Sequence, residues 1–304
     1  MQLDLFEDNR PSILLNTADE FIRSRELGEA VRMYQQLLAD YPGDKSAATL
    51  RDLVGSWRDL LSGIGANHGS PERLHSIWIG LETVRHAALR TVILELLIEA
   101  LRSLPDSERI YLPPRFHQGQ VLMEAGRFAE AADSFLAALS HACTPRGRFL
   151  AWRGDALTLA GNNDAALRCY LASFLEDPLT VALSSVRNRT IHNLHLAMHF
   201  EAGEEIEEHE EPAWLPVWGW FEGLFTLPCH PVPQEDPPSA AAFEALVARR
   251  EDRVPRLWFD MLAYAESLRI ASLVDRELAA VRRLMKRCNG FMFACYLEKI
   301  NGRR

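Results

Sequence analysis

The sequence predicts an all-α protein made of antiparallel helical hairpins, and three observations lead to this fold class. A pattern of small and aromatic residues in the middle of the chain recurs 35 residues downstream. In both copies, apolar residues fall at helical spacing on either side of a central glycine, which is typical of two helices joined by a tight turn. No segment shows the alternation of apolar and polar residues that a half-buried strand requires. The matched positions are Gly119, Leu122, Gly126, Ala131, Phe135 and Ala138 in the first copy, and Gly154, Leu157, Gly161, Ala166, Tyr170 and Ser173 in the second.

The small residues of each copy predict how its two helices pack. Gly126 and Gly161 are expected to end the first helix, because glycine adopts a left-handed backbone conformation at little cost. Gly119 is expected to face Ala131, so that the two helices approach closely, while Phe135 fills the space beside them. The equivalent residues of the second copy predict the same arrangement.

This pattern resembles the tetratricopeptide repeat, a unit of about 34 residues in which small and aromatic residues recur and a proline closes the second helix. The second copy closes at Pro178 and the first at Pro145, although both lack the leucine that precedes the first glycine in the family. The resemblance implies a right-handed superhelical array of hairpins, whose first helices line a concave groove for a peptide or a partner helix. A third match near the N-terminus consists of Leu14, Ala18, Phe21, Ala30, Tyr34 and Pro42.

The rest of the chain is expected to be helical as well. Ala30 precedes Ala131 by 101 residues, close to three repeat units, which predicts two further hairpins in the gap. Ser70 ahead of Pro71 predicts a helix start, because a serine oxygen caps a helix and proline presets its first turn. Further helices are expected at 181–203, 239–251, 254–272 and 275–288, with a last short helix after Asn289 and Gly290.

These patterns divide the chain into four regions. They are an N-terminal arm (1–10), a tetratricopeptide-like repeat domain (11–205), an acidic, aromatic and proline-rich connector (206–238) and a small C-terminal helical region (239–304). Seven acidic residues lie between Glu201 and Glu211, where the repeat domain meets the connector.

The composition argues against several classes of protein. The 304 residues include 33 Lys and Arg against 42 Asp and Glu, a net charge of −9, which disfavours nucleic acid or an anionic membrane as the main partner. The N-terminus has neither the basic start nor the apolar core of a secretory signal, and no apolar run is long enough for a membrane span. The five cysteines form no CxxC pair. A reduced, cytoplasmic protein is therefore expected, with no direct contact to nucleic acid or membrane.

The resemblance also indicates candidate groove residues, because the first helix of each hairpin lines the groove in this family. The first helices of the two best copies would place one aromatic residue, one methionine and both signs of charge there. That mixture does not resemble a uniform clamp for a carboxylate. The simpler interpretation is exposed helix residues without a ligand. The candidates are Phe116, Gln120, Met123 and Glu124 in the first copy and Arg148, Asp155 and Thr158 in the second.

The N-terminal arm carries a second candidate site, the sequence Gln2-Leu3-Asp4-Leu5-Phe6. It resembles at all five positions the short QL(S/D)LF peptide by which bacterial replication and repair proteins bind the DNA sliding clamp. In that interpretation the arm folds on binding, with Leu5 and Phe6 in an apolar pocket and Gln2 hydrogen-bonded at its rim. The simpler alternative is an arm whose apolar residues cover the open end of the first hairpin.

His192, His195 and His199 form a third candidate site, because spacings of three and four place them on one stripe of a helix. His195 and His199 are spaced to share a metal ion, and His209 and nearby glutamates would complete its ligand set. A metal-dependent hydrolase or metal sensor is therefore the alternative function. The simpler interpretation is three hydrogen-bonded histidines, and the glutamate of an HExxH motif is not present as a general base.

Trp214, Trp218, Phe221 and Phe225 lie on one stripe of a short helix. This indicates either a structural helix that seals the last hairpin or a tethered occupant of the groove. The sequence contains no phosphate-binding or nucleophile motif. It therefore predicts a non-catalytic bacterial scaffold or adaptor, without a cofactor, that binds a protein or peptide, with recruitment to the sliding clamp as the most specific version. The oligomeric state is not predicted.

Overall fold

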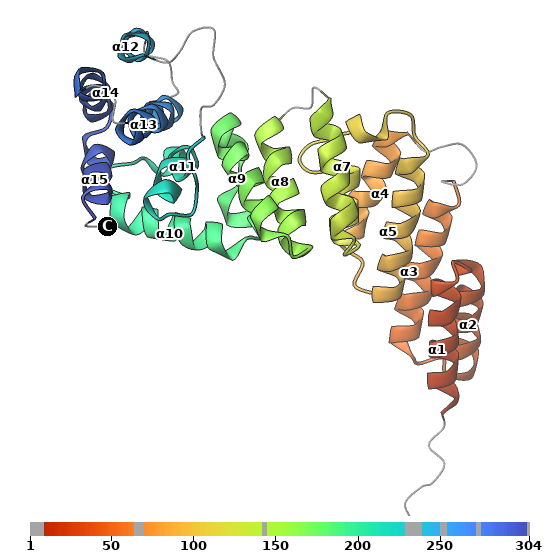
Figure 1. The fold of residues 1–304 in the computed structure, drawn as a ribbon. Coiled ribbons are helices and arrows are strands. Elements are labelled where there is room, and N and C mark those ends of the chain that lie inside the picture. Colours follow the sequence, from red (N-terminus) through yellow and green to blue (C-terminus); the bar gives the residue numbers. More distant parts are fainter. Residues whose placement is uncertain are drawn as a thin grey trace, which may run out of the picture. The chain divides into compact units, whose positions relative to one another are not determined.

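The predicted all-α fold class is confirmed by the structure of the chain, a computed structural model that describes residues 9–63, 70–141, 145–228, 239–249, 254–271 and 275–302. These residues form fifteen α-helices and four short 3₁₀ helices (Figure 1). Within them no strand is formed, apart from a single bridge between Leu112 and Phe116. None of the described helices combines the length and the apolar character needed to cross a bilayer. The motif at residues 2–6 lies outside the described residues.

The chain folds as two compact units, Met1–Ala138 (unit 1) and Leu139–Arg304 (unit 2). The boundary falls near the end of α7, so most of the first repeat copy lies in unit 1 and the second lies in unit 2. The region 11–205, predicted as the repeat domain, therefore contributes to both units, and residues 206–304 belong to unit 2.

Unit 1 is a set of packed helices that begins with the hairpin α1–α2. Helix α3 packs on α2, and α5 contacts α1, α4 and α6. The predicted start at Ser70 is confirmed, because its hydroxyl accepts from the N–H of Arg73 at the start of α4. Between the outer repeat copies the described residues form three α-helices, α3 to α5, where two complete hairpins were expected. The helices are α1 (Arg10–Arg23), α2 (Leu27–Asp40), α3 (Lys45–Leu61), α4 (Pro71–Leu81), α5 (Ala87–Arg102), α6 (Gln118–Glu124) and α7 (Phe128–Ser140), with the 3₁₀ helix η1 at Ser107–Arg109.

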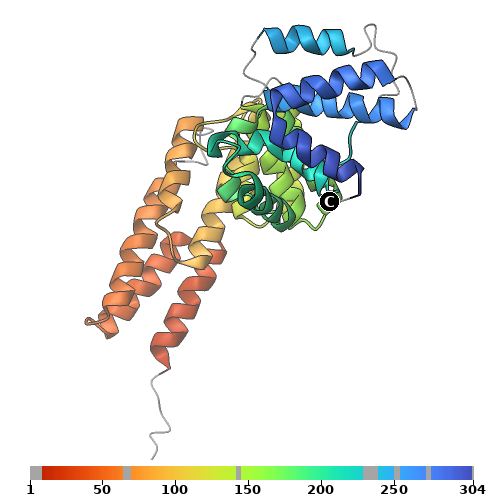
Figure 2. The same cartoon turned by 90° about the vertical axis from the view of Figure 1, so that its left-hand side faces the viewer.

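Unit 2 begins with the closely packed hairpin α8–α9, followed by six more α-helices. Helix α10 crosses the direction of α8 and α9 (Figure 1), and α12, α13 and α14 run side by side (Figure 2). Asn289 follows the last residue of α14 and caps α15, where its side-chain oxygen accepts a hydrogen bond from the N–H of Met292. The α-helices are α8 (Arg146–Leu159), α9 (Asn163–Glu176), α10 (Arg189–Ala202), α11 (Glu211–Phe221), α12 (Ala240–Ala248), α13 (Val254–Ile270), α14 (Asp275–Cys288) and α15 (Gly290–Ile300). The 3₁₀ helices are η2 (Pro178–Thr180), η3 (Leu183–Ser185) and η4 (Glu208–Glu210).

The two repeat copies form the helical pairs α6–α7 and α8–α9, with the predicted turns. Gly126 and Gly161 follow the first helix with φ of +74° and +83°, the left-handed conformation that glycine permits. A Cβ on Gly119 would lie 2.4 Å from the ring of Phe135, so only glycine allows this approach. Ala131 and Ala166, the small residues of the second helices, are both fully buried.

Three residues of the predicted aromatic stripe lie on α11 in the core of unit 2, whereas Phe225 is buried beyond the end of that helix. Trp214, Trp218 and Phe221 are at most 2% exposed. Trp214 and Phe221 contact the ring of Trp258 on α13 edge to face, with ring centroids 6.1 Å and 6.3 Å apart. Helix α11 also packs on α9, α10 and α15. Of the two interpretations of this stripe, the contacts match the structural helix.

The predicted helix 181–203 is wrong in its first third, because α10 begins only at Arg189. The side chain of Asn188 accepts hydrogen bonds from the N–H groups of Thr190 and Ile191, which ends the helix on this side. The N–H of Arg187 binds the carboxylate of Asp155, in α8, 32 residues earlier. The N–H of Arg187, directly before Asn188, is therefore satisfied by a side chain and not by the carbonyl of an α-helical turn.

Candidate functional site

The four candidate groove residues of the first copy lie in different environments. Phe116 is fully buried and its ring centroid lies 5.2 Å from that of His75, so it belongs to the core. Gln120 and Met123 are half-buried. Glu124 is exposed, and its carboxylate pairs with the guanidinium of Arg90 on α5 at 2.7 Å, within unit 1.

Phe116 differs from the expectation because the first helix of this copy starts late. Pro113 and Pro114 stand 35 residues before Arg148 and Phe149, which lie in the first turn of α8. Proline has no N–H to donate within a helix, and α6 begins only at Gln118. Phe116 thus precedes the first helix and does not line the groove.

The three candidate groove residues of the second copy all hydrogen bond one segment, residues 180–188, which we call the strap. Arg148 Nε donates to the carbonyl of Thr180 at 3.2 Å. Asp155 Oδ1 accepts from the N–H of Arg187 at 2.7 Å. Thr158 Oγ1 accepts from the side-chain amide of Asn188 at 3.0 Å. The face of α8 that was predicted to bind a ligand is therefore covered by the chain itself.

The strap runs alongside α8 in the same direction, because its first residue contacts the start of that helix and its last residues contact later turns. A further repeat copy in register would begin its first helix 35 residues after Arg146, at position 181. The strap, with the short turn η3 and the buried side chain of Val181, occupies that part of the sequence instead.

Asp155 is the charged centre of this arrangement. The residue is 6% exposed, and Oδ1 also accepts from the hydroxyl of Tyr170 at 2.6 Å. Burial raises the pKa of Asp155 to about 6, although the hydrogen bonds from Tyr170 and Arg187 partly offset this effect. Burial, and then the nearby Asp155 carboxylate, raises the pKa of Tyr170. The pair is therefore a hydrogen-bonded anchor for the strap.

His195 and His199 converge on a single buried carboxylate at the start of α11. Glu211 is 3% exposed, with Oε2 2.5 Å from His195 Nε2 and Oε1 2.7 Å from His199 Nδ1. His192 is exposed on the same helix. Across the described ranges, no group of three or more His, Cys, Asp or Glu side chains is arranged to hold a metal ion. The contacts are those of hydrogen bonds that join α10 to α11.

The charges of this cluster also favour a structural role, in which the histidines and Glu211 join α10 to α11. Burial of Glu211 acts to raise its pKa, but hydrogen bonds from His199 and His195 outweigh burial, so that the pKa lies below its usual value. The hydrogen bond to Glu211 raises the pKa of His199. An ionised carboxylate and its histidine partners thus hold the hairpin α10–α11 together.

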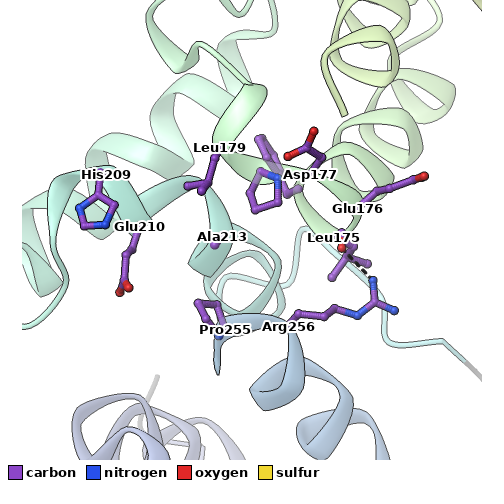
Figure 3. A pocket seen from close by; sticks show the side chains of 11 residues that line it. Leu175, Glu176, Asp177, Leu179, His209, Glu210, Ala213, Pro255 and Arg256 are labelled. Carbon is purple, nitrogen blue, oxygen red and sulfur yellow. Dashed lines mark hydrogen bonds between the residues drawn. The ribbon is translucent and has the colours of Figure 1, made fainter. Parts of the chain in front are cut away.

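A cavity of about 520 Å³ opens in unit 2 where the ends of three helices meet (Figure 3). The end of α9 and the following Pro178 and Leu179 form one wall, the start of α11 forms the second, and Pro255 and Arg256 of α13 form the third. Its volume is within the range of ligand sites in proteins.

Several of these residues were not found from the sequence. Tyr170 was predicted as an aromatic residue of the repeat, but its hydrogen bond to Asp155 was not, and no local pattern marks Arg187. Glu211 lies among the glutamates that were expected to complete the histidine cluster, but its burial at the start of α11 depends on the fold.

Neither a family model, nor a curated protein, nor a solved structure matches this chain.

Proposed function

We propose that this protein is a non-catalytic scaffold, a tetratricopeptide-like adaptor that binds an extended segment of a partner protein along the first helices of its hairpins. The observation that carries the proposal is the strap. Arg148, Asp155 and Thr158 were predicted as groove residues, and all three hydrogen bond a segment of the chain that is not α-helical.

The contacts to the strap also indicate how a partner would be recognised. Arg148 and Asp155 bind a backbone carbonyl and a backbone N–H, so they do not require a particular side chain. Gln120 and Met123 stand 35 residues before Asp155 and Thr158, at the equivalent positions of the first copy. We expect the partner segment to contact these two side chains in unit 1.

Photo-crosslinking from the first helix tests this proposal. A photoreactive phenylalanine analogue at position 123 is expected to form an adduct with another polypeptide in cells that naturally produce the protein. The matched control carries the analogue in place of Leu136, which is 45% exposed on the second helix, α7. Replacing Gln120 with Ala should weaken the adduct at position 123. Equal adducts from positions 123 and 136 would contradict a specific site on the first helix.

Recruitment to the sliding clamp is a separate part of the proposal, supported by Gln2, Leu5 and Phe6 in the N-terminal arm. Purified clamp should be retained by the full chain and lost on removal of residues 1–8. A second variant with Leu5 and Phe6 replaced by Ala should lose it as well, because both side chains would enter the apolar pocket. Equal recovery of clamp by all three proteins would end this hypothesis.

The alternative function, a metal-dependent hydrolase or metal sensor, was predicted from the stripe of His192, His195 and His199, of which His195 and His199 contact Glu211. Its test is elemental analysis of protein purified without a histidine tag. A stoichiometric transition metal that disappears in the His195→Ala variant would favour the alternative over the scaffold.

A further inference from the structure

The cavity at the start of α11 combines an apolar floor with acidic groups at its edge. Pro178, Leu179, Ala213 and Pro255 present apolar surface, and the buried Phe174 also lines the cavity. Leu179 is 69% exposed although it is a large apolar residue, and it is one of the side chains that line the cavity (Figure 3). An exposed leucine beside a cavity is an available contact for an apolar ligand group.

Two carboxylates at the cavity form no ion pair with any residue that the structure describes. Asp177 and Glu210 lie on opposite sides of Ala213 (Figure 3), and among the described residues neither forms an ion pair. Glu176, the third carboxylate, is paired with Arg146 at 2.6 Å.

The one guanidinium in the cavity wall is already engaged. Arg256 donates from Nη1 to the carbonyl of Leu175 at 3.0 Å and from Nε to the carboxylate of Asp260 at 3.2 Å. The amino ends of α11 and α13 each contribute roughly half a positive charge, while the carboxyl end of α9 contributes about half a negative one. The two negative charges of Asp177 and Glu210 outweigh the small net positive charge of these three helix ends, so the cavity favours a cation.

We propose that this cavity binds an arginine or lysine side chain of a partner polypeptide. The aliphatic stem of that side chain would lie on Ala213 and Pro255, and its charged end would reach Asp177 or Glu210. The site is in unit 2, apart from Gln120 and Met123, so it does not depend on binding along the first helices.

An adjoining cavity explains why the ligand is a polypeptide. A second space of about 550 Å³ shares Leu179 and His209 with the first, and continues past Val181 and Leu183. The two spaces therefore flank Leu179. A chain with a basic residue in the first cavity would place a neighbouring apolar residue in the second, whereas a free amine would fill only one.

Selection from a peptide library tests the proposal with the full chain. Random seven-residue peptides displayed on phage would be panned against the natural protein and against the double variant Asp177→Asn, Glu210→Gln. The natural protein should enrich peptides with Arg or Lys beside an apolar residue. The double variant should bind the selected peptides about tenfold more weakly, because it loses charge-assisted hydrogen bonds.

Two further variants show whether weaker binding results from the cavity itself or from the change in the protein's net charge, and a folding control accompanies each of them. Glu204→Gln with Glu205→Gln changes the same charge at exposed positions outside the cavity and should bind as the natural protein does. Ala213→Leu fills the cavity without changing its charge and should weaken binding. Thermal unfolding of each variant confirms that it folds.

Three results would overturn the proposal. One is selection without enrichment of Arg or Lys, and another is binding that the double variant leaves unchanged. The third is displacement of the selected peptides by free spermidine at equal affinity, which would identify a site for small amines instead of a polypeptide.

Discussion

The two best repeat copies, α6–α7 in unit 1 and α8–α9 in unit 2, have the same interior but different polar surroundings. In both, a glycine of the first helix lies against an aromatic ring of the second, Gly119 on Phe135 and Gly154 on Tyr170. In the second copy the Tyr170 hydroxyl binds Asp155, which also holds the strap. The first copy has phenylalanine and glutamine at these two positions and thus lacks the acid.

The buried polar group of the first copy is a histidine with a different role. His117 is fully buried, and its ring stacks on Phe135 with centroids 5.4 Å apart. Nδ1 accepts from the N–H of Gly119 at 2.9 Å, and Nε2 lies 3.3 Å from the carbonyl of Glu108. A shared apolar frame thus leaves two or three polar positions to determine what the neighbouring segment does.

The largest expected difference between the copies is their response to acid. Burial lowers the pKa of His117 to about 4 from 6.5, so between pH 6.5 and 4 the unfolded chain binds a proton that the folded chain does not. Stability of unit 1 should therefore fall as the pH is lowered. Burial raises the pKa of Asp155 to about 6 from 3.8, so its contribution to the stability of unit 2 should rise as the pH falls from 6 to 4. Each effect is on the order of 3 kcal/mol at most.

Hydrogen exchange read by mass spectrometry measures this difference, because it reports on each unit separately. After correction for intrinsic exchange rates, protection at pH 4.5 relative to pH 6.5 should fall around His117 and rise around Asp155. His117→Gln and Asp155→Asn should each remove the change in its own unit only. An identical loss of protection in both units, unaffected by these variants, would contradict the assignment.

The close helix contacts should differ in their tolerance of a methyl group. A Cβ at position 119 would lie 2.4 Å from the Phe135 ring, whereas one at position 154 would lie 2.9 Å from the Tyr170 ring. Overpacking costs about 1–3 kcal/mol, and alanine recovers up to about 1 kcal/mol of helix propensity. Gly119→Ala should therefore destabilise by about 2 kcal/mol and Gly154→Ala by about 1 kcal/mol in denaturant unfolding.

Gly28 provides the matched control for both glycines. It is exposed on α2, and a Cβ there would meet nothing within 4 Å. Gly28→Ala should therefore be neutral or stabilising by up to about 1 kcal/mol. If the contact with Phe135 causes the cost at position 119, adding Phe135→Leu should relieve part of it, and strictly additive effects would refute that cause.

The sequence predicted these helix pairs because their signals are local and periodic. Gly126 and Gly161 mark the turns within each copy, and the small residues that allow close packing fall at fixed offsets from them. The strap could not be predicted in the same way, since its conformation depends on Asp155, 32 residues before Arg187. One local signal was available, because Asn188 before an apolar helical run is a typical N-cap.

The candidate sites were harder to predict than the fold. The cavity brings together Asp177, Glu210 and Arg256 from three segments, and no spacing in the sequence connects them. The histidine stripe was visible as a pattern, but the choice between a metal and a hydrogen-bonded carboxylate depends on where Glu211 lies. Distances between segments, and not residue types, determine these outcomes.

The smallest expected effect concerns tyrosines that share one repeat position. Tyr34 of the N-terminal match and Tyr170 are both buried at the position that Phe135 holds in the first copy. The Tyr170 hydroxyl binds Asp155, whereas the Tyr34 hydroxyl has no hydrogen-bond partner within the part of the chain that the structure describes. Tyr170→Phe should cost about 1 kcal/mol in denaturant unfolding, and Tyr34→Phe should be neutral or slightly stabilising. Tyr170→Phe should also speed trypsin cleavage after Arg187, because the strap loses part of its anchor. Equal losses of unfolding free energy for the two tyrosine variants would show that the Asp155 hydrogen bond does not distinguish the copies.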